Sequence, residues 1–232
     1  MTTDQSRTGV GIAATLMGIG ALWYLVMEAV SAIGFPGYSY SHNYISDLGV
    51  PVPGVFQGRA IDSQLANVMN AGFLGQALMI ALAGVVLWWS LPQGRRRSGV
   101  LALALIHSFG ISFVGLVHGS PANADAGLAV FHFGGALMAI VGGNALVFLA
   151  GTRTFRSLLA PWFGRVSAML SVFGIASLVV LAVTSSNGTI FLFDYGVWER
   201  ASVYTITAWQ LIFAVLTMSK LRPTANTDAE GV

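Results

Sequence analysis

The segment Val10–Ile33, VGIAATLMGIGALWYLVMEAVSAI, decides the fold class of this chain, because it is almost continuously apolar and carries one charged residue, Glu28. A helix of roughly 20 mainly apolar residues is long enough to cross the hydrocarbon core of a bilayer. Comparable segments recur along the sequence at about Leu65–Trp89, Gly99–Val117, Gly127–Leu149, Leu159–Val183 and Glu199–Met218. The sequence therefore predicts an all-α, polytopic transmembrane helix bundle with six spans.

The composition of the whole chain also indicates a membrane protein. Of its 232 residues, 55% are hydrophobic and 9% are charged, and the mean hydropathy is +0.74. A soluble domain carries roughly 25% charged residues, whereas lipid accepts apolar side chains on the outside of a bundle. The absence of cysteine excludes disulfides, thiolate metal sites and cysteine nucleophiles. The first apolar run is longer than a signal-peptide core, so we expect it to be a retained span.

The basic residues are sorted to one side of the predicted bundle. With six spans, the two termini and the loops 91–98 and 152–165 share one side. Nine of the eleven Lys and Arg residues lie there: Arg7, Arg95, Arg96, Arg97, Arg153, Arg156, Arg165, Lys220 and Arg222. Because short basic loops stay cytoplasmic, the pattern predicts a multi-pass protein of the cell inner (plasma) membrane with both termini inside. These cations mark topology or contact anionic lipids, and no nucleic-acid partner is expected.

The predicted domain organisation is a single unit. Residues 1–222 form one transmembrane bundle, and residues 223–232 form a polar tail that we expect to be disordered. The longest connection, 34–64, lies on the extracytoplasmic side and is rich in aromatic and aliphatic residues. A connection of this composition is expected to pack over the end of the bundle as an ordered lid.

Titratable residues gather at the extracytoplasmic ends of the spans and in the connections there. The expected ligand-binding set is Glu28, His42, Asp47, His118, His132, Glu199 and Arg200. Each of these groups is costly at or just inside an apolar slab unless it finds partners. We therefore predict that they meet beneath the 34–64 lid as a polar pocket, with Glu28 and His42 at its edge, and that Arg200 pairs with Asp47 or another acid.

Two of the histidines are candidate metal ligands. His118 ends the third span and His132 lies near the start of the fourth, so the imidazoles of these antiparallel neighbours can face one another. Two His and a carboxylate are the minimum set for a catalytic zinc-type site. The spacing matches no closed metal motif, and a hydrogen-bonded structural role explains each His singly. His107 has no partner His at its depth, so haem is not expected.

Three motifs resemble a known family. They are Ile-Ser-Asp-Leu-Gly at Ile45–Gly49, the stretch Gly115–His132 with its two histidines, and Gly-x-x-Glu-Arg at Gly196–Arg200. Over about residues 10–220, the chain resembles the bacterial and archaeal membrane proteins known as domain of unknown function 998. The resemblance implies a six-span or similar bundle with these motifs on the outer side, and it implies no particular activity.

Three classes of function stay open, and whether the protein is an enzyme stays open with them. The first is an outward-facing polar pocket that binds a lipid headgroup or small ligand. The second is a metal-dependent intramembrane hydrolase acting on a lipid. A divalent metal such as zinc would be held by His118, His132 and either His42 or a carboxylate, with Asp47 or Glu199 as base. The third is an accessory subunit of a membrane complex. The expected partners are membrane lipids and, for the third class, other membrane-protein subunits.

Overall fold

Six long helices form the body of the protein. The structure, a computed structural model, describes residues 3–156 and 158–221. The long helices are α1 (Thr3–Ile33), α2 (Ala66–Ser90), α3 (Arg95–Leu116), α5 (Ala129–Leu149), α6 (Pro161–Asn187) and α7 (Tyr195–Leu221). All six are long and apolar enough to cross a membrane. The prediction of an all-α bundle with six spans is therefore confirmed, and the chain is a multi-pass membrane protein; the predicted tail 223–232 lies outside the described residues.

The helices extend beyond the apolar segments from which they were predicted. α1 begins at Thr3 instead of Val10, and α7 begins at Tyr195 instead of Glu199. Polar residues can continue a helix once it has left the hydrocarbon core, because water then satisfies their side chains. α5 continues into a π-helical turn, η2 (Ala150–Thr154). The connection 118–126 contains a short helix that was not predicted, α4 (Pro121–Asp125), whose start is capped by the side chain of Ser120.

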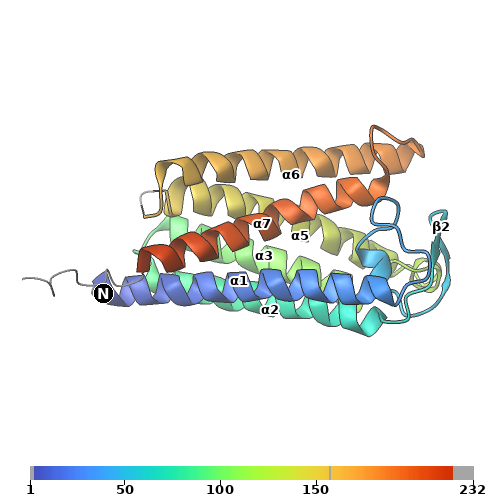
Figure 1. Cartoon of the computed structure of the whole chain (residues 1–232), viewed down its shortest axis with the longest axis horizontal. Helices are drawn as coiled ribbons and strands as arrows, with labels where there is room; N and C mark the ends of the chain where they lie inside the picture. The colour runs from blue at the N-terminus through green and yellow to red at the C-terminus, as the bar shows by residue number, and fades with distance from the viewer. Residues whose placement is uncertain (1–2, 157, 222–232) are drawn as a thin grey trace, which may run out of the picture.

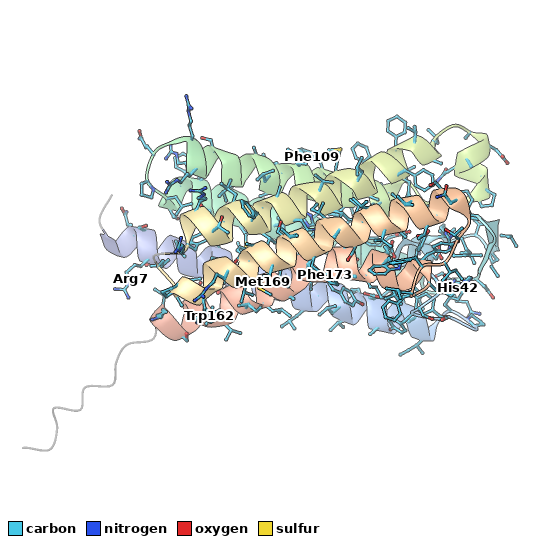
Figure 2. All side chains as sticks on the ribbon, turned by 90° about the horizontal axis from the view of Figure 1, so that it is seen from above. Arg7, His42, Phe109, Trp162, Met169 and Phe173 are labelled. Atoms are coloured by element: carbon cyan, nitrogen blue, oxygen red, sulfur yellow. The ribbon has the colours of Figure 1, made fainter. Side chains whose placement is uncertain are left out.

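The six long helices form a closed ring in the order of the chain. α1 packs on α2, α2 on α3, α3 on α5, α5 on α6 and α6 on α7, and α7 returns to α1. Figure 1 shows the start of α1 and the end of α7 at one end of the bundle, with β2 and its neighbouring loops at the other. We call these the basic end and the cap end. In Figure 2, Arg7 lies at the basic end and His42 at the cap end.

The outside of the ring is apolar along its length. Met169 and Phe173 on α6 are 71% and 54% exposed, and Figure 2 shows them on the outer side of this helix. The inside holds two clusters of buried apolar residues. The cluster toward the basic end includes Trp209 and Phe213, whose rings stack with centroids 5.1 Å apart. An exterior as apolar as this is stable in lipid and would be costly in water.

Glycine allows the closest approach between two of the helices. At Gly110 on α3, an added Cβ would lie 2.4 Å from the backbone nitrogen of Ala139 and 2.6 Å from the carbonyl oxygen of Gly135 on α5. Real side chains do not tolerate such distances to backbone atoms, so the α3–α5 contact requires glycine here. Small residues at helix interfaces are the usual way in which membrane helices pack closely.

The long connection, residues 34–64, packs against one end of the bundle, and we call it the cap segment. It contains a 3-10 turn, η1 (Ser46–Gly49), and two antiparallel strands, β1 (Gly54–Phe56) and β2 (Arg59–Ile61). Gln57 and Gly58 between the strands both have positive φ, as in the type I′ turns that suit hairpins. Its side chains Ile45, Leu48 and Ile61 are buried against α2 and α3. The sequence analysis did not predict this hairpin.

Candidate functional site

A buried ion pair joins the first and last helices at the cap end. Arg200 on α7 donates from Nε to Oε1 of Glu28 on α1 over 3.1 Å, and Tyr204 donates to Oε2 of the same carboxylate over 2.8 Å. Only 2% of Glu28 is exposed. Both oxygens of Glu28 therefore have partners within the protein. Arg200 pairs with this acid and not with Asp47.

The same arginine holds the cap segment against the bundle. Its Nη1 donates to the carbonyl oxygens of Tyr40 and Asn43, over 2.7 and 2.8 Å, and its Nη2 donates to the hydroxyl of Tyr38. The Arg200 guanidinium also lies 4.8 Å from the ring centre of Tyr40. Burial raises the pKa of the Tyr38 hydroxyl, so this hydroxyl stays neutral. Every guanidinium nitrogen of Arg200 is used, which makes this residue an anchor for the cap segment.

A second buried ion pair lies inside the cap segment. Arg59 on β2 donates from Nε and Nη2 to the two oxygens of Asp47 in η1, over 2.9 and 3.1 Å. Burial alone would lower the pKa of Arg59, but the hydrogen bonds and charge of Asp47 raise it above its usual value, so Arg59 stays protonated. Arg59 stacks 3.8 Å from the ring centre of Tyr44, and burial raises the pKa of that hydroxyl to about 12. Asp47 thus holds the hairpin to η1.

His118 and His132 lie close together but have different environments. His118 Nε2 accepts a hydrogen bond from Asn70 Nδ2 over 3.1 Å, and Asn70 also donates to the Gly49 carbonyl oxygen over 2.9 Å. Burial lowers the pKa of His118, although a hydrogen bond to the Gly115 carbonyl opposes this. Gly119 lies against the ring of His132: an added Cβ at Gly119 would be 3.1 Å from His132 Nε2.

One ring nitrogen of His132 has no hydrogen-bond partner among the described residues. Its Nδ1 donates to the carbonyl oxygen of Val117 over 2.7 Å, so in the neutral ring Nε2 is the acceptor. Glu199 also has one polar atom with a partner and one without. Its Oε2 accepts a hydrogen bond from the backbone N–H of Ile45, while Oε1 has no hydrogen-bond partner among the residues described. These two side chains are the predicted site residues that retain an acceptor without a partner and that line a common space.

That space is a groove of about 360 Å³ between α5, α6 and the cap segment. Its polar lining comes from Tyr44, Ser46, Gln57, His132, Ser185 and Glu199. Its apolar lining comes from Phe133, Ala136, Leu137, Ile140, Leu178, Leu181 and Ala182. The polar residues of α5 and α7 lie near the cap-end starts of their helices, and Leu137 and Ile140 follow further along α5. The groove is therefore polar at the cap end and apolar toward the middle of the bundle.

A smaller cavity of about 50 Å³ lies on the inner side of the groove and shares Ser46, Ala136, Ile140 and Glu199 with it. His107 lines this inner cavity. Its Nδ1 donates to the Ala139 carbonyl oxygen over 2.7 Å, and its buried Nε2 has no partner among the described residues. Sequence reasoning placed His107 apart from the candidate site, because depth alone does not show which way a side chain faces.

The residues present do not fit a divalent metal such as zinc. Across residues 3–156 and 158–221, no group of three or more His, Asp or Glu side chains could hold a metal ion. The lone pair of His118 is used by Asn70, and both oxygens of Asp47 are used by Arg59. His42 lies at the exposed rim, where its Nδ1 is 2.9 Å from Oδ2 of Asp194 in the α6–α7 connection.

The seven predicted site residues thus lie at the cap end in distinct groups. Glu28, Arg200 and Asp47 hold the fold together, His118 is bound to Asn70, His42 is at the rim, and His132 and Glu199 face the groove. Sequence reasoning missed Asn70, which no motif marks, and the groove residues Gln57 and Ser185. Ser46, beside Asp47, was noted only as part of the Ile45–Gly49 motif. The groove residues come together only because the cap segment, α5 and α6 pack against one another, and no local sequence pattern encodes that packing.

The comparisons with known proteins agree with the motifs in the sequence. The family described as "Protein of unknown function (DUF998)" matches residues 18–216, a range that contains all seven predicted site residues. No curated protein and no solved structure matches the chain. The resemblance inferred from the motifs is therefore confirmed, and the chain belongs to the DUF998 family.

Proposed function

We propose that this protein binds a membrane amphiphile, with the headgroup at Glu199 and His132 and the hydrocarbon tail along α5 and α6. The observation that carries the proposal is the sorted lining of the groove, which is polar at the cap end and apolar toward the middle of the bundle. A free polar metabolite would leave the apolar half of this groove unused. Ligand sites combine apolar walls with a few polar groups that fix orientation.

The dimensions of the groove suit a lipid tail. His132 and Ile140 are eight residues apart on α5, which corresponds to roughly 12 Å of helix at 1.5 Å per residue. Leu178 and Leu181 on α6 provide the facing wall. A tail already in lipid reaches the groove without crossing water, so its contact with these walls rests on packing, because lipid is as apolar as the groove.

The headgroup that fits this site carries hydrogen-bond donors. Glu199 Oε1 and His132 Nε2 are acceptors, and the nearby cations Arg59 and Arg200 are held by Asp47 and Glu28. An anionic headgroup would face the Glu199 carboxylate without a free cation. A primary ammonium group, by contrast, gains charge-assisted hydrogen bonds there.

We infer the leaflet of the groove from the charge of the basic end. If the basic loops are cytoplasmic, as their charge predicts, the cap end lies on the extracytoplasmic side and the groove takes its ligand from the outer leaflet of the plasma membrane.

Native mass spectrometry of the detergent-purified protein tests the proposal. The probes are phosphatidylethanolamine, phosphatidylcholine and phosphatidylglycerol with identical acyl chains. We expect phosphatidylethanolamine to be retained most, because it alone presents a primary ammonium group. Glu199→Gln keeps the size of the side chain and an acceptor for Ile45 but removes the charge, and it should abolish this preference.

Asp62→Asn is the matched control, because it removes one acidic charge near the start of α2 without changing the groove lining. It should retain the preference of the unmodified protein. Equal retention of the three lipids by the unmodified protein, or the same loss in both variants, would contradict the proposal.

A second candidate role, as an accessory subunit, is supported by one feature of the α6–α7 connection. Ile190, Phe191, Leu192 and Phe193 are consecutive and each is more than half exposed. Large apolar side chains at such a tip are typical of contact surfaces. Copurification of a stoichiometric partner from the native membrane that is lost in Leu192→Ser would support this role, and recovery of the chain alone from mild detergent would argue against it.

A further inference from the structure

The basic end contains a depression with an unusual concentration of arginine. It has a volume of about 470 Å³ and is lined by Arg96, Thr152, Arg153, Arg156 and Pro161. A neighbouring depression of about 450 Å³ shares Arg96 and Arg153 with it and adds Arg95 and Arg97. No acidic residue contributes to either lining in the part of the chain that the structure describes.

Within residues 3–156 and 158–221, no acidic side chain pairs with the guanidinium groups around this depression. Arg96 Nη1 donates to the backbone carbonyl of Arg153 over 3.3 Å, which brings the α3 arginine to the η2 turn. Among the described residues, Arg96, Arg153 and Arg156 form no ion pair. Like charges held at one place repel each other, so this arrangement favours an anion that can accept hydrogen bonds from several guanidinium groups at once.

Two long helices begin at residues that line these depressions. α3 begins at Arg95 and α6 at Pro161, and neither has a side-chain cap: the residues before them are Gly94 and Ala160. The first N–H groups of a helix lack internal partners and carry partial positive charge, which attracts anions. This feature is independent of the arginine side chains and favours the same ligand charge.

Aromatic residues at this end indicate the depth of the depression in a bilayer. Trp88 and Trp89 lie in the last turn of α2, Trp162 lies in the first turn of α6, and Trp89 and Trp162 are exposed. Arg97 extends along Trp88, with its guanidinium 4.6 Å from the ring centre. Tryptophan is enriched at the level of the lipid headgroups, so the depression lies where phosphate groups of phospholipids are abundant.

We propose that Arg96, Arg153 and Arg156 form a phosphate-binding site that holds the headgroup of an anionic phospholipid. Guanidinium groups bind phosphate through paired hydrogen bonds, and three of them exceed what a zwitterionic headgroup would neutralise. The site lies at the opposite end of the bundle from the groove at Glu199 and prefers the opposite headgroup charge. It is therefore independent of the proposed amphiphile groove.

Titration of short-chain phosphatidylglycerol into detergent-purified protein, followed by tryptophan fluorescence, tests this site. Arg96→Gln and Arg153→Gln should each weaken binding about tenfold, the loss of one charge-assisted hydrogen bond. Both side chains are exposed, so the variants should keep the melting temperature of the unmodified protein. Arg165→Gln is the matched control: it removes an exposed charge on α6 that lines neither depression, and it should bind as the unmodified protein does.

The same titration with inorganic phosphate in place of the lipid shows whether the site binds a lipid headgroup or free phosphate. Weak or no binding of inorganic phosphate, with arginine-dependent binding of phosphatidylglycerol, supports a lipid site. Arginine-dependent binding of inorganic phosphate that is as tight as that of the lipid overturns the lipid assignment and leaves a site for free phosphate. Equal binding by all variants, or an equal loss in Arg165→Gln, overturns the site itself.

Discussion

At the scale of single residues, the buried charged side chains of the cap end are of two kinds. In one kind every polar atom has a partner, and in the other one polar atom has none among the described residues. Arg200 and Glu28 use every polar side-chain atom within the protein, whereas Glu199 keeps Oε1 free beside the groove. Burying a charge is tolerable only with partners. A fully partnered pair therefore supports the fold, and a partly partnered group beside a groove is a candidate for binding.

We predict that Arg200→Gln strongly destabilises the protein. Removal of one partner from a buried ion pair leaves the other charge uncompensated, which typically costs about 3–5 kcal/mol. The cap segment should also become sensitive to protease, because the bonds to the Tyr40 and Asn43 carbonyls are lost. Chemical unfolding in detergent measures the first effect and limited proteolysis the second. An unchanged unfolding midpoint would mean that Arg200 is not the anchor.

We predict that His118 makes the protein less stable in mild acid. Burial lowers the pKa of His118, so the unfolded chain takes up a proton at a higher pH than the folded protein does. The contribution of neutral His118 to the free energy of unfolding is therefore complete above the ordinary histidine pKa of about 6.5. It is lost as the pH falls below that value. Protonation of Nε2 would also place a donor against the donor Asn70 Nδ2.

His118→Asn tests this pH dependence, because its amide oxygen can still accept from Asn70 but does not titrate. The melting temperature of the variant should fall less than that of the unmodified protein between about pH 8 and pH 5. His107 and His132 are present in both proteins, so the difference reports on His118. Parallel curves for the two proteins would contradict the assignment.

At the scale of elements, hydropathy predicted the long helices well and the cap hairpin not at all. Segments such as Val10–Ile33 are decided by their length and by the cost of exposing backbone in lipid, so a local pattern is sufficient. The strands Gly54–Phe56 and Arg59–Ile61 are three residues each. They depend on burial of Ile61 and on the Asp47–Arg59 pair, which are tertiary contacts.

The sequence predicted how deep along the bundle axis the site residues lie. It did not predict which neighbouring helix each side chain faces. The polarity of Glu199 and His132 placed both residues at one end of the bundle, and they do face a common groove. The partners of Arg200 and Asp47 could not be assigned, because several acids lay at similar depth and the sequence does not specify which helix faces which. For the same reason, the sequence did not show that Asn70 contacts His118.

We predict opposite effects of alanine at two adjacent glycines of α5. A Cβ at Gly135 would lie 2.5 Å from the Phe113 Cβ and 2.8 Å from the Gly110 carbonyl oxygen, whereas a Cβ at Gly134 would meet nothing within 4 Å. Gly135→Ala should therefore cost about 1–3 kcal/mol through overpacking. Gly134→Ala should be neutral or stabilising by up to about 1 kcal/mol, because alanine favours helix. Equal unfolding midpoints would contradict the close α3–α5 contact.

At the scale of the whole molecule, the closed ring places all the connections at two ends of different chemistry. The basic end has the arginine depression, and the cap end has the covered groove with its two free acceptors. Charge sorting predicts that the basic end is cytoplasmic. The two proposed sites would then draw on different leaflets, one for anionic headgroups and the other for headgroups with donors.

The natural absence of cysteine makes this orientation easy to measure. Val52 in the cap segment and Ser98 near the start of α3 are exposed. In intact cells, Val52→Cys should react with a membrane-impermeant maleimide, and Ser98→Cys should react only after permeabilisation. Labelling of Ser98→Cys alone in intact cells would reverse the leaflets.

The most direct test of the central claim is photo-crosslinking of lipid from within the groove. A photoreactive amino acid replaces Leu181, which lines the groove, or Val179, which is exposed on α6 but does not line it. The adducts formed in native membranes are identified by mass spectrometry. We predict that position 181 captures lipids with primary ammonium headgroups above their bulk proportion, that Glu199→Gln removes this enrichment, and that position 179 captures lipids in bulk proportion. The same bulk mixture at both positions, unchanged by Glu199→Gln, would contradict a specific amphiphile site.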